Sequence, residues 1–386
     1  MHVQTGAGTS ELHRAPSDPN EPFHVRIHEE SFKSYKCDPP TLDVQVTKGQ
    51  LLTMYHQMQT MRRMEMTADR LYKAQLMRGF CHLSIGQEAV SVGMHNAIEP
   101  DDRIITAYRC HPFAVLRGGS IKGLLGELMG RECGMSKGKG GSMHVFTKTF
   151  FGGNGIVGAG VPLGAGIAFA AKYQNLNVAT FDIYGDGASN QGQVFEAFNM
   201  AKLWDLPCVF VCENNQYGMG TSAERSSANP LFYTRGDTIP GIQVNGMDII
   251  ATRQATAFAK RWVVEEKRGP LLVEFVTYRY AGHSMSDPGT TYRSRDEVQQ
   301  MRSTRDPIRG LCSYLEEWGV VASQDELKAI DNEARAEVEK AAEEAQASPE
   351  PAAASIWHDV YYPGTEPPFM RGREREEVRY ICCYVS

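Results

Sequence analysis

The sequence predicts an α/β protein built on a doubly wound, mostly parallel sheet flanked by helices. Three short apolar segments end in turn-forming residues, at 178–184, 207–212 and 271–277. Two segments with helical character separate them, at 191–204 and 249–267. Alternating strands and helices are typical of parallel sheets, in which helices form the crossover connections. Ligands of such sheets bind beyond the carboxyl ends of the strands.

Three regions follow one another along the 386 residues. Residues 1–45 are polar and interrupted by prolines, which indicates an extended N-terminal arm. From Thr47 to about Arg78 apolar residues recur every three or four positions and predict an amphipathic helix, the first element of an α/β domain over residues 46–320. Residues 321–386 are expected to form a helical and then irregular C-terminal extension. A capping box over Ser323–Glu326 would start its helix.

The composition excludes several classes of protein. The chain has 40 Lys and Arg against 46 Asp and Glu, a formal net charge of −6, whereas nucleic-acid binding needs clustered positive charge. The longest apolar run, Ile156–Ala171, is shorter than the ~18 residues that suggest a membrane span. The nine cysteines are odd in number and include no CxxC pair, so we expect reduced thiols and no zinc site. We therefore expect neither a nucleic-acid partner nor a membrane.

Glycine is unevenly distributed along the chain. Of the 37 glycines, 14 lie between Gly134 and Gly192. Glycine permits backbone conformations and close approaches that a side chain would prevent. The cluster therefore indicates a region where the backbone closes on a ligand or on another segment.

Two polar turns follow neighbouring predicted strands. Asp186 lies between two glycines after the first strand, and Asn215 follows the next strand 29 residues later, beside the carbonyls of the loop 216–218. One crossover connection has about this length, which would place the two strand ends side by side. A carboxylate, an amide oxygen and a carbonyl, with two phosphate oxygens and a water, would suit octahedral Mg²⁺. Taken singly, each turn could equally be an independent surface turn.

The run GDGASNQG at 185–192, followed by ENN at 213–215, resembles the thiamine diphosphate motif. From about Thr47 to Phe369 the chain resembles the pyruvate dehydrogenase alpha subunits, in the family of thiamine diphosphate-dependent 2-oxo acid dehydrogenases. The likeness includes RGFCHL, ITAYR, GKGGSMH, GGNGIVGA, VPLGAGIA and GHSMSDPG. It implies the thiamine diphosphate-binding fold. It also implies oxidative decarboxylation of pyruvate with reductive acetylation of lipoyl groups, which feeds acetyl-CoA formation.

The resemblance also implies the residues of the site. The ligands of Mg²⁺ would be Asp186, Asn215 and the carbonyl of Tyr217. His82 and His283 would be catalytic, because histidine can donate to a substrate carboxylate or move a proton near neutral pH. Thr147 matches a position of substrate contact. Besides the three metal ligands, the residues that would contact thiamine diphosphate are His82, Tyr108, Arg109, Gly155, Val157, Gly187, Ala188, Arg279 and His283.

The resemblance implies that the chain supplies only part of an active site. The family takes the carboxylate that activates the cofactor from a beta subunit, in an α2β2 heterotetramer. The chain alone should then be inactive, and the Gly/Ala run Gly158–Ala171 would be a suitable interface helix. Further expected partners are the lipoyl domain of dihydrolipoyl acetyltransferase and the pyruvate dehydrogenase kinase and phosphatase.

Residues 279–295 have the character of a regulatory loop. Ser284 and Thr291 match two phosphorylation positions of the family, and Ser222 matches a third. Without the resemblance, an ordinary solvated loop would be the simpler interpretation. Relatives that carry this loop work in the mitochondrial matrix, although the acidic first 45 residues do not look like a transit peptide.

Two positions depart from the family pattern. Ala281 stands where relatives usually have His, and Gly160 where they usually have Gln. Ala281 leaves a catalytically impaired regulatory paralogue open as an alternative. Independently of these departures, a branched-chain 2-oxo acid dehydrogenase or acetoin dehydrogenase alpha subunit is a neighbouring possibility. The motifs GHSMSDPG and GKGGSMH favour pyruvate. A dinucleotide-binding oxidoreductase is disfavoured, because no GxGxxG opens the first strand–helix turn.

Overall fold

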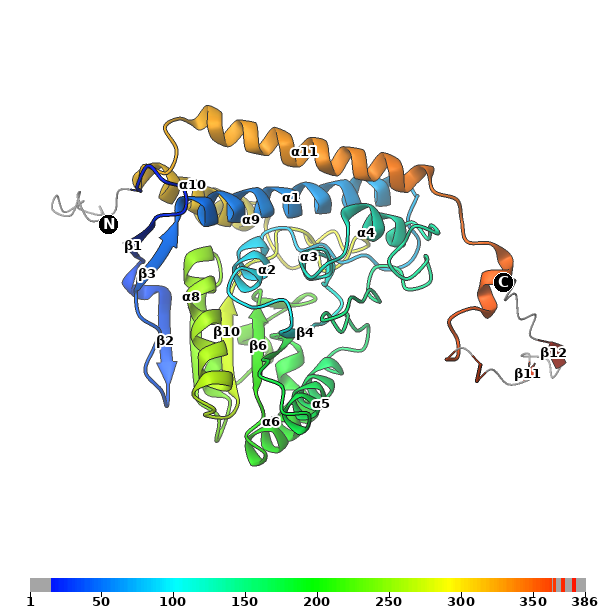
Figure 1. Ribbon diagram of the computed structural model, residues 1–386, viewed down its shortest axis with the longest axis horizontal. Helices are drawn as coiled ribbons and strands as arrows, with labels where there is room; N and C mark the ends of the chain where they lie inside the picture. The colour runs from blue at the N-terminus through cyan, green and yellow to red at the C-terminus, as the bar shows by residue number, and fades with distance from the viewer. Residues whose placement is uncertain (1–14, 363, 366–368, 372–376, 380–386) are drawn as a thin grey trace.

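A six-stranded sheet is the centre of the computed structural model, which describes residues 15–362, 364–365, 369–371 and 377–379 (Figure 1). The strand order is β2-β9-β10-β6-β5-β4, and every neighbouring pair is parallel except β2 and β9. The predicted doubly wound, mostly parallel sheet is confirmed. Its strands are β2 (Phe32–Tyr35), β4 (Arg103–Ile105), β5 (Thr180–Gly185), β6 (Cys208–Asn214), β9 (Gly241–Asn245) and β10 (Leu271–Val276).

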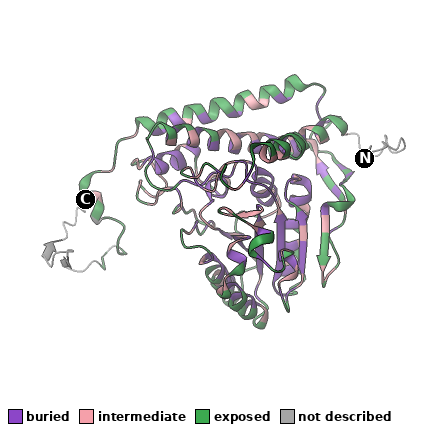
Figure 2. Cartoon of the chain, turned by 180° about the vertical axis from the view of Figure 1, so that it is seen from behind, coloured by how far each residue is buried: buried purple, intermediate pink, exposed green. Residues whose placement is uncertain are grey.

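Helices cover both faces of the sheet, so its central strands are apolar on both sides. On β6, Val209 and Val211 join one core cluster, while Phe210 and Cys212 join the other. This follows from the period of two along a strand. The first cluster includes side chains of α1 (Lys48–Lys73), α2 (Glu88–His95) and α8 (Ile249–Lys260), and the second includes those of α5 (Gly160–Tyr173) and α6 (Gly192–Leu203). Figure 2 shows the buried strands between these layers.

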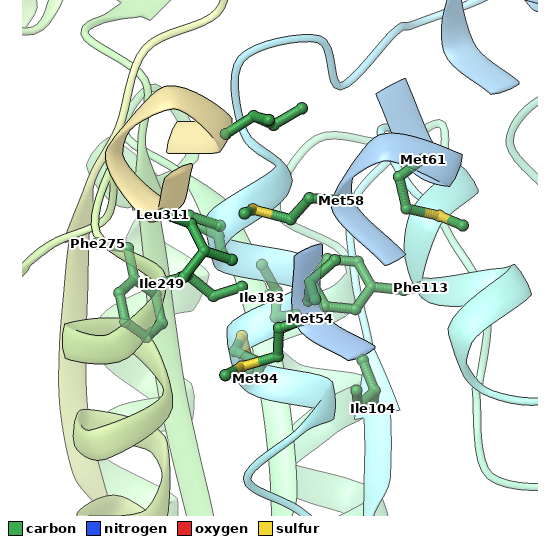
Figure 3. Packing of buried hydrophobic residues seen from close by; sticks show 14 of the residues in the cluster. Met54, Met58, Met61, Met94, Ile104, Phe113, Ile183, Ile249, Phe275 and Leu311 are labelled. Carbon is green, nitrogen blue, oxygen red and sulfur yellow. The ribbon is translucent and has the colours of Figure 1, made fainter. Parts of the chain in front are cut away.

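Helix α1 forms where the apolar periodicity predicts it. A capping box of Thr47 and Gln50 starts it, and it ends at Lys73, earlier than the expected Arg78. Its stripe of Met54, Met58 and Met61 is fully buried and points into the main core, towards side chains of α2, α3 (His111–Leu116) and α10 (Pro307–Glu317) (Figure 3). The methionine stripe is therefore core packing.

Helix α5 uses its small residues to pack against its own sheet. A Cβ placed on Gly164 would lie 2.4 Å from the carboxyl of Asp182 on β5, so only glycine fits this contact. The outer face of α5 instead carries large apolar side chains, namely Leu163, Phe169 and Tyr173, which are 52%, 46% and 80% exposed. Any partner on this helix would contact these large side chains.

The C-terminal extension lies along α1. Helix α11 (Gln324–Ala347) packs against α1 and α4 (Ile121–Leu128), with its other side exposed (Figures 1 and 2). The expected capping box at its start is wrong: the Ser323 side chain makes no capping bond. Ser323 is fully extended, and Glu326 accepts the N–H of Ala322 at 3.0 Å instead.

Part of the N-terminal arm belongs to the sheet. Strand β2 pairs with β9 as an antiparallel edge strand. Strands β1 (Pro22–Arg26) and β3 (Asp43–Thr47) pair with each other and lead into α1. The remaining elements are η1 (Glu29–Ser31), α3 (His111–Leu116), η2 (Ala188–Asn190), β7 (Tyr217–Gly218), β8 (Thr221–Ser222), α7 (Ala223–Ser226), η3 (Phe232–Thr234), the π-helical η4 (Arg261–Glu265), α9 (Arg295–Thr304), α10 (Pro307–Glu317), η5 (Ala353–Trp357), β11 (Phe369–Arg371) and β12 (Glu377–Arg379).

Two further properties concern the chain as a whole. The seven cysteines among the described residues are free thiols, as expected, while Cys382 and Cys383 lie outside those residues. None of the described helices combines the length and apolar character that a membrane crossing requires.

The glycine-rich loop after α4 is held by one buried carboxylate. The two oxygens of Glu127 accept backbone N–H groups of Ser136, Gly138, Gly140 and Gly141 at 2.6–3.0 Å. Gly138 and Gly141 have positive φ, which lets successive amides turn towards the same acceptor. The hydrogen bonds to Glu127 thus fix the conformation of this loop in place of regular secondary structure.

We predict that Glu127→Ala lowers the free energy of unfolding by about 3 kcal/mol, since each buried N–H left without an acceptor costs about 1–3 kcal/mol and water will reach some of them. Urea denaturation measures this change. Glu127→Gln keeps one acceptor oxygen and should lie in between. Glu132→Ala removes an exposed carboxylate from the same loop and is the control; an equal loss in the control would contradict the prediction.

Candidate functional site

The two polar turns meet at the carboxyl edge of the sheet. Strands β5 and β6 are parallel neighbours, and their last residue pair is Gly185 with Glu213. Asp186 and Asn215 follow these strand ends directly. A Cβ placed on Gly187 would lie 3.3 Å from Cα of Gly218, so the two turns are in close contact. The expected adjacency of the strands is therefore present.

Asp186 is a buried carboxylate that the protein leaves partly unsatisfied. It is 2% exposed, and its Oδ2 has no hydrogen-bond partner among the described residues. Burial raises its pKa to about 6, against the opposing influence of the Arg279 charge. An unpaired buried carboxylate oxygen is costly, and a bound cation would remove this cost.

The other two expected metal ligands also have free capacity. Asn215 Oδ1 accepts only long bonds, from the Tyr217 N–H at 3.4 Å and from Arg279 at 3.5 Å. The same Arg279 nitrogen lies 3.4 Å from the carbonyl oxygen of Tyr217, so both oxygens border one small volume. In the described part of the chain, no cluster of three or more His, Cys, Asp or Glu side chains could hold a metal ion. A metal here would need the amide and carbonyl oxygens and oxygens of a ligand.

Two buried arginines add positive charge without a carboxylate partner in the described hydrogen bonds. Arg109 donates to the carbonyls of Leu83 and His283. Arg279, 1% exposed, donates to backbone carbonyls and to the hydroxyl of Tyr292. Burial and the charge of Arg109 lower the pKa of Arg279 to about 10. Two such guanidinium groups suit a polyanionic group such as a diphosphate.

The two expected catalytic histidines come together beside Tyr108. The ring centroids of His82 and His283 are 5.3 Å apart, and Tyr108 lies 4.4 Å from His82 and 5.4 Å from His283. Burial, followed by the charge of Arg109, lowers the pKa of His82 to about 3 and that of His283 to about 4. Both rings are thus neutral near pH 7, and each has a buried Nδ1 without a partner in the described structure.

The expected aminopyrimidine segment is tied to the diphosphate loop. Gly155 and Val157 are exposed, and the carbonyl of Val157 accepts the side-chain amide of Gln191 at 2.6 Å. Ala188 is buried in η2, the first turn of that loop. Thr147 uses its hydroxyl locally, donating to the carbonyl of Arg117 at 2.8 Å, and no described hydrogen bond joins it to the histidines.

The three expected phosphorylation positions differ in exposure. Ser284 is buried, and its hydroxyl lies 2.9 Å from that of Ser286. Thr291 is exposed. Ser222 is half-buried and caps α7 by accepting the N–H of Arg225 at 3.3 Å.

The loop 279–295 is held in place by Tyr292 and Arg293, two residues that have no assigned role in the sequence analysis. The hydroxyl of Tyr292 donates to Asp287 at 2.5 Å and accepts from Arg279 at 3.1 Å. Arg293 donates to the carbonyls of Arg279 and Ala281 and lies over three tyrosine rings. The sequence does contain a signal for this anchoring. A Tyr–Arg pair directly follows Thr291, and these two residue types can anchor a polar loop to a buried surface.

Comparison with known proteins agrees with this geometry. The family model for the dehydrogenase E1 component matches residues 56–354. A protein of Chaetomium thermophilum named pyruvate dehydrogenase E1 component subunit alpha, mitochondrial, is 58% identical over 383 residues, or 98% of this chain and 93% of its own. The protein of that name from Schizosaccharomyces pombe is 59% identical over 379 residues, or 97% and 92% of the two chains.

A human relative is more distant but carries a corresponding name. The somatic form of the pyruvate dehydrogenase E1 component subunit alpha, mitochondrial, from Homo sapiens is 53% identical over 350 residues, which is 89% of this chain and 88% of its own. The chain therefore belongs to the dehydrogenase E1 component family, together with these pyruvate dehydrogenase alpha subunits.

Proposed function

We propose that the chain is the thiamine diphosphate- and Mg²⁺-dependent alpha subunit of a pyruvate dehydrogenase. It would take part in the oxidative decarboxylation of pyruvate and the reductive acetylation of lipoyl groups. The observation that carries the proposal is the buried, partly unpaired carboxylate of Asp186, which follows β5 next to the turn that carries Asn215 and Tyr217, with two buried arginines nearby.

Each end of the cofactor would meet a different part of the site. Thiamine diphosphate supplies the reactive carbon and the electron sink for decarboxylation when it is bound. Asp186, Asn215 and the Tyr217 carbonyl would hold Mg²⁺. Tyr108, Arg109, Gly187, Ala188 and Arg279 would surround the diphosphate, with Gly155 and Val157 at the aminopyrimidine.

The histidines would act as neutral groups. Because burial keeps His82 and His283 uncharged near pH 7, each can donate one N–H and accept at the other nitrogen. They could hold the carboxylate of a 2-oxo acid or transfer a proton to a lipoyl sulfur. The positive charge of Arg109 behind both rings favours an anionic substrate.

The second half of the active site would come from a beta subunit. The large apolar residues on the outer face of α5 continue to the end of α6, where the ring of Trp204, the residue that follows this helix, lies 5.3 Å from that of Phe169. Ile156 and Val157, 73% and 43% exposed, extend this surface to the cofactor segment. An apolar surface of this kind marks an interface. A subunit bound here would reach the cofactor, as an α2β2 assembly requires.

The departure at Ala281 does not touch the bonds that close the loop. Only the carbonyl of Ala281 takes part, accepting from Arg279 and Arg293, and any residue offers that carbonyl. This supports an active enzyme over an impaired regulatory paralogue. The names of the relatives place them in mitochondria, and we propose the mitochondrial matrix, with the lipoyl domain, kinase and phosphatase as further partners.

The proposal predicts activity only in an assembly. The chain co-expressed with a pyruvate dehydrogenase beta subunit should reduce an artificial electron acceptor when pyruvate, thiamine diphosphate and Mg²⁺ are present. The chain alone should not, since it offers only one diphosphate-binding module. Equal turnover of 3-methyl-2-oxobutanoate would favour the branched-chain alternative, and full activity of the chain alone would contradict the assembly.

Asp186→Asn should weaken cofactor binding at least ~100-fold, because the loss of a metal-ligating charge removes a major part of the affinity. Calorimetric titration of the assembled protein with thiamine diphosphate and Mg²⁺ measures this change. Asp205→Asn changes an exposed carboxylate after α6 and should bind the cofactor normally. Equal affinity in the Asp186 variant would rule out the proposed metal site.

Ser284→Glu should abolish turnover while cofactor affinity changes little. A charged side chain cannot occupy the buried place of Ser284 next to His283, so the loop must open. Limited proteolysis between residues 279 and 295 should report this opening. Thr291→Glu alters an exposed position and should have a smaller effect. Unchanged turnover in Ser284→Glu would defeat the proposed switch.

A further inference from the structure

A buried chain of three polar side chains lies outside the proposed machinery. Glu65 of α1, His111 at the start of α3 and Ser142 in the glycine-rich loop are 1%, 0% and 8% exposed. Glu65 Oε2 lies 3.0 Å from His111 Nδ1, and His111 Nε2 lies 2.9 Å from the hydroxyl of Ser142. Three segments distant in sequence are thereby joined in one hydrogen-bonded row.

The carboxylate of Glu65 has partners on both sides. Its Oε1 accepts the backbone N–H of Ser84 at 3.1 Å, and its other oxygen is bonded to His111 Nδ1. The second ring nitrogen of His111 is bonded to the Ser142 hydroxyl. Every polar atom of the row is satisfied in this arrangement.

The two ends of this hydrogen-bonded row lie next to the two segments that would border the cofactor. Ser84 is two residues after His82, and the carbonyl of the residue between them accepts Arg109. On the other side, Ser142 precedes Met143, which packs against the segment that leads to Val157. A Cβ on Gly153 would lie 2.6 Å from the Met143 carbonyl oxygen, and one on Gly155 would lie 3.6 Å from the Met143 sulfur.

We propose that Glu65 is a positioning residue that fixes the spacing between His82 and the aminopyrimidine-facing segment, acting through Ser84 on one side and through His111 and Ser142 on the other. The assignment of these two segments to the cofactor site rests on the proposed function. A buried ion in an otherwise apolar stripe is poor evidence of added stability, since apolar packing often serves as well. The bonds of Glu65 instead give it a geometric role.

Glu65→Leu removes both bonds. Glu65→Gln keeps both, since its oxygen can still accept from Ser84 while its amide group donates to His111. Thr60→Val is the matched control, since Thr60 lies on the same helix, is buried and has a hydroxyl without a described partner. All variants are made in the full chain co-expressed with a beta subunit.

The first measurement is hydrogen exchange without cofactor, followed in peptides that cover 80–86 and 142–157. Glu65→Leu should speed exchange about tenfold in both peptides, and Ser142→Ala in the second only. Glu65→Gln and Thr60→Val should match the parent protein. This readout does not depend on pyruvate turnover, so it tests the positioning role even if the proposed function fails.

The second measurement separates positioning from stability. Glu65→Leu should lower kcat at least ~10-fold, while the dissociation constant of thiamine diphosphate changes less than ~3-fold, because the proposed metal ligands, with Gly187 and Ala188, lie after β5 and β6 and do not contact Glu65 in the described hydrogen bonds. Glu65→Gln should restore most of kcat. Unchanged exchange in both peptides, or a loss of stability with unchanged kcat, would overturn the proposal. If Glu65→Leu does not fold, Ser142→Ala decides by the same two measurements.

Discussion

The parallel pairing of β5 with β6 is the constraint on which the site depends. It brings Asp186 and Asn215, 29 residues apart, to one edge of the sheet. Because helices cover both faces of these strands, the turns that follow them enter a region with little water. Gly187, directly after Asp186, lets the two turns approach closely, since a Cβ there would lie 3.3 Å from Cα of Gly218. The polar side chains at the strand ends are thus buried, and there an uncompensated charge carries a large free-energy cost.

Burial then acts on each group according to the charge it would carry. It raises the pKa of Asp186 and lowers those of His82, His283 and Arg279, since each shift favours the neutral form. Glu65 and Glu127 are as deeply buried, yet the chain gives each of them hydrogen-bond donors. Two buried carboxylates of the described residues keep unpaired oxygens instead. Asp182 lies within β5 against Gly164, where burial raises its pKa and favours the neutral form, whereas Asp186 lies at the strand end, where ligands of such sheets bind.

The sequence predicts the sheet, the methionine stripe of α1 and the adjacency of the two turns, because these depend on short periods and on one crossover length. It does not predict partners that only the fold brings together, such as the four amides around Glu127. The sequence does indicate that Glu65 is buried, because Glu65 follows Met61 by four residues and so lies on the buried stripe of α1. A charged residue at such a position needs a buried partner. The capping box at Ser323 failed because Glu326 bonds the N–H of Ala322 and not that of Ser323, a shift of one residue that the motif does not determine.

Arg279 connects the parts of the molecule that would have to respond together. Its guanidinium group reaches the oxygens of Asn215 and Tyr217 on one side and the hydroxyl of Tyr292, which holds the loop 279–295, on the other. A metal at the sheet edge would compete with this guanidinium group for the two oxygens, and a diphosphate would attract the guanidinium group itself. Under the proposed function, one side chain would therefore couple cofactor binding to order in the segment that carries His283.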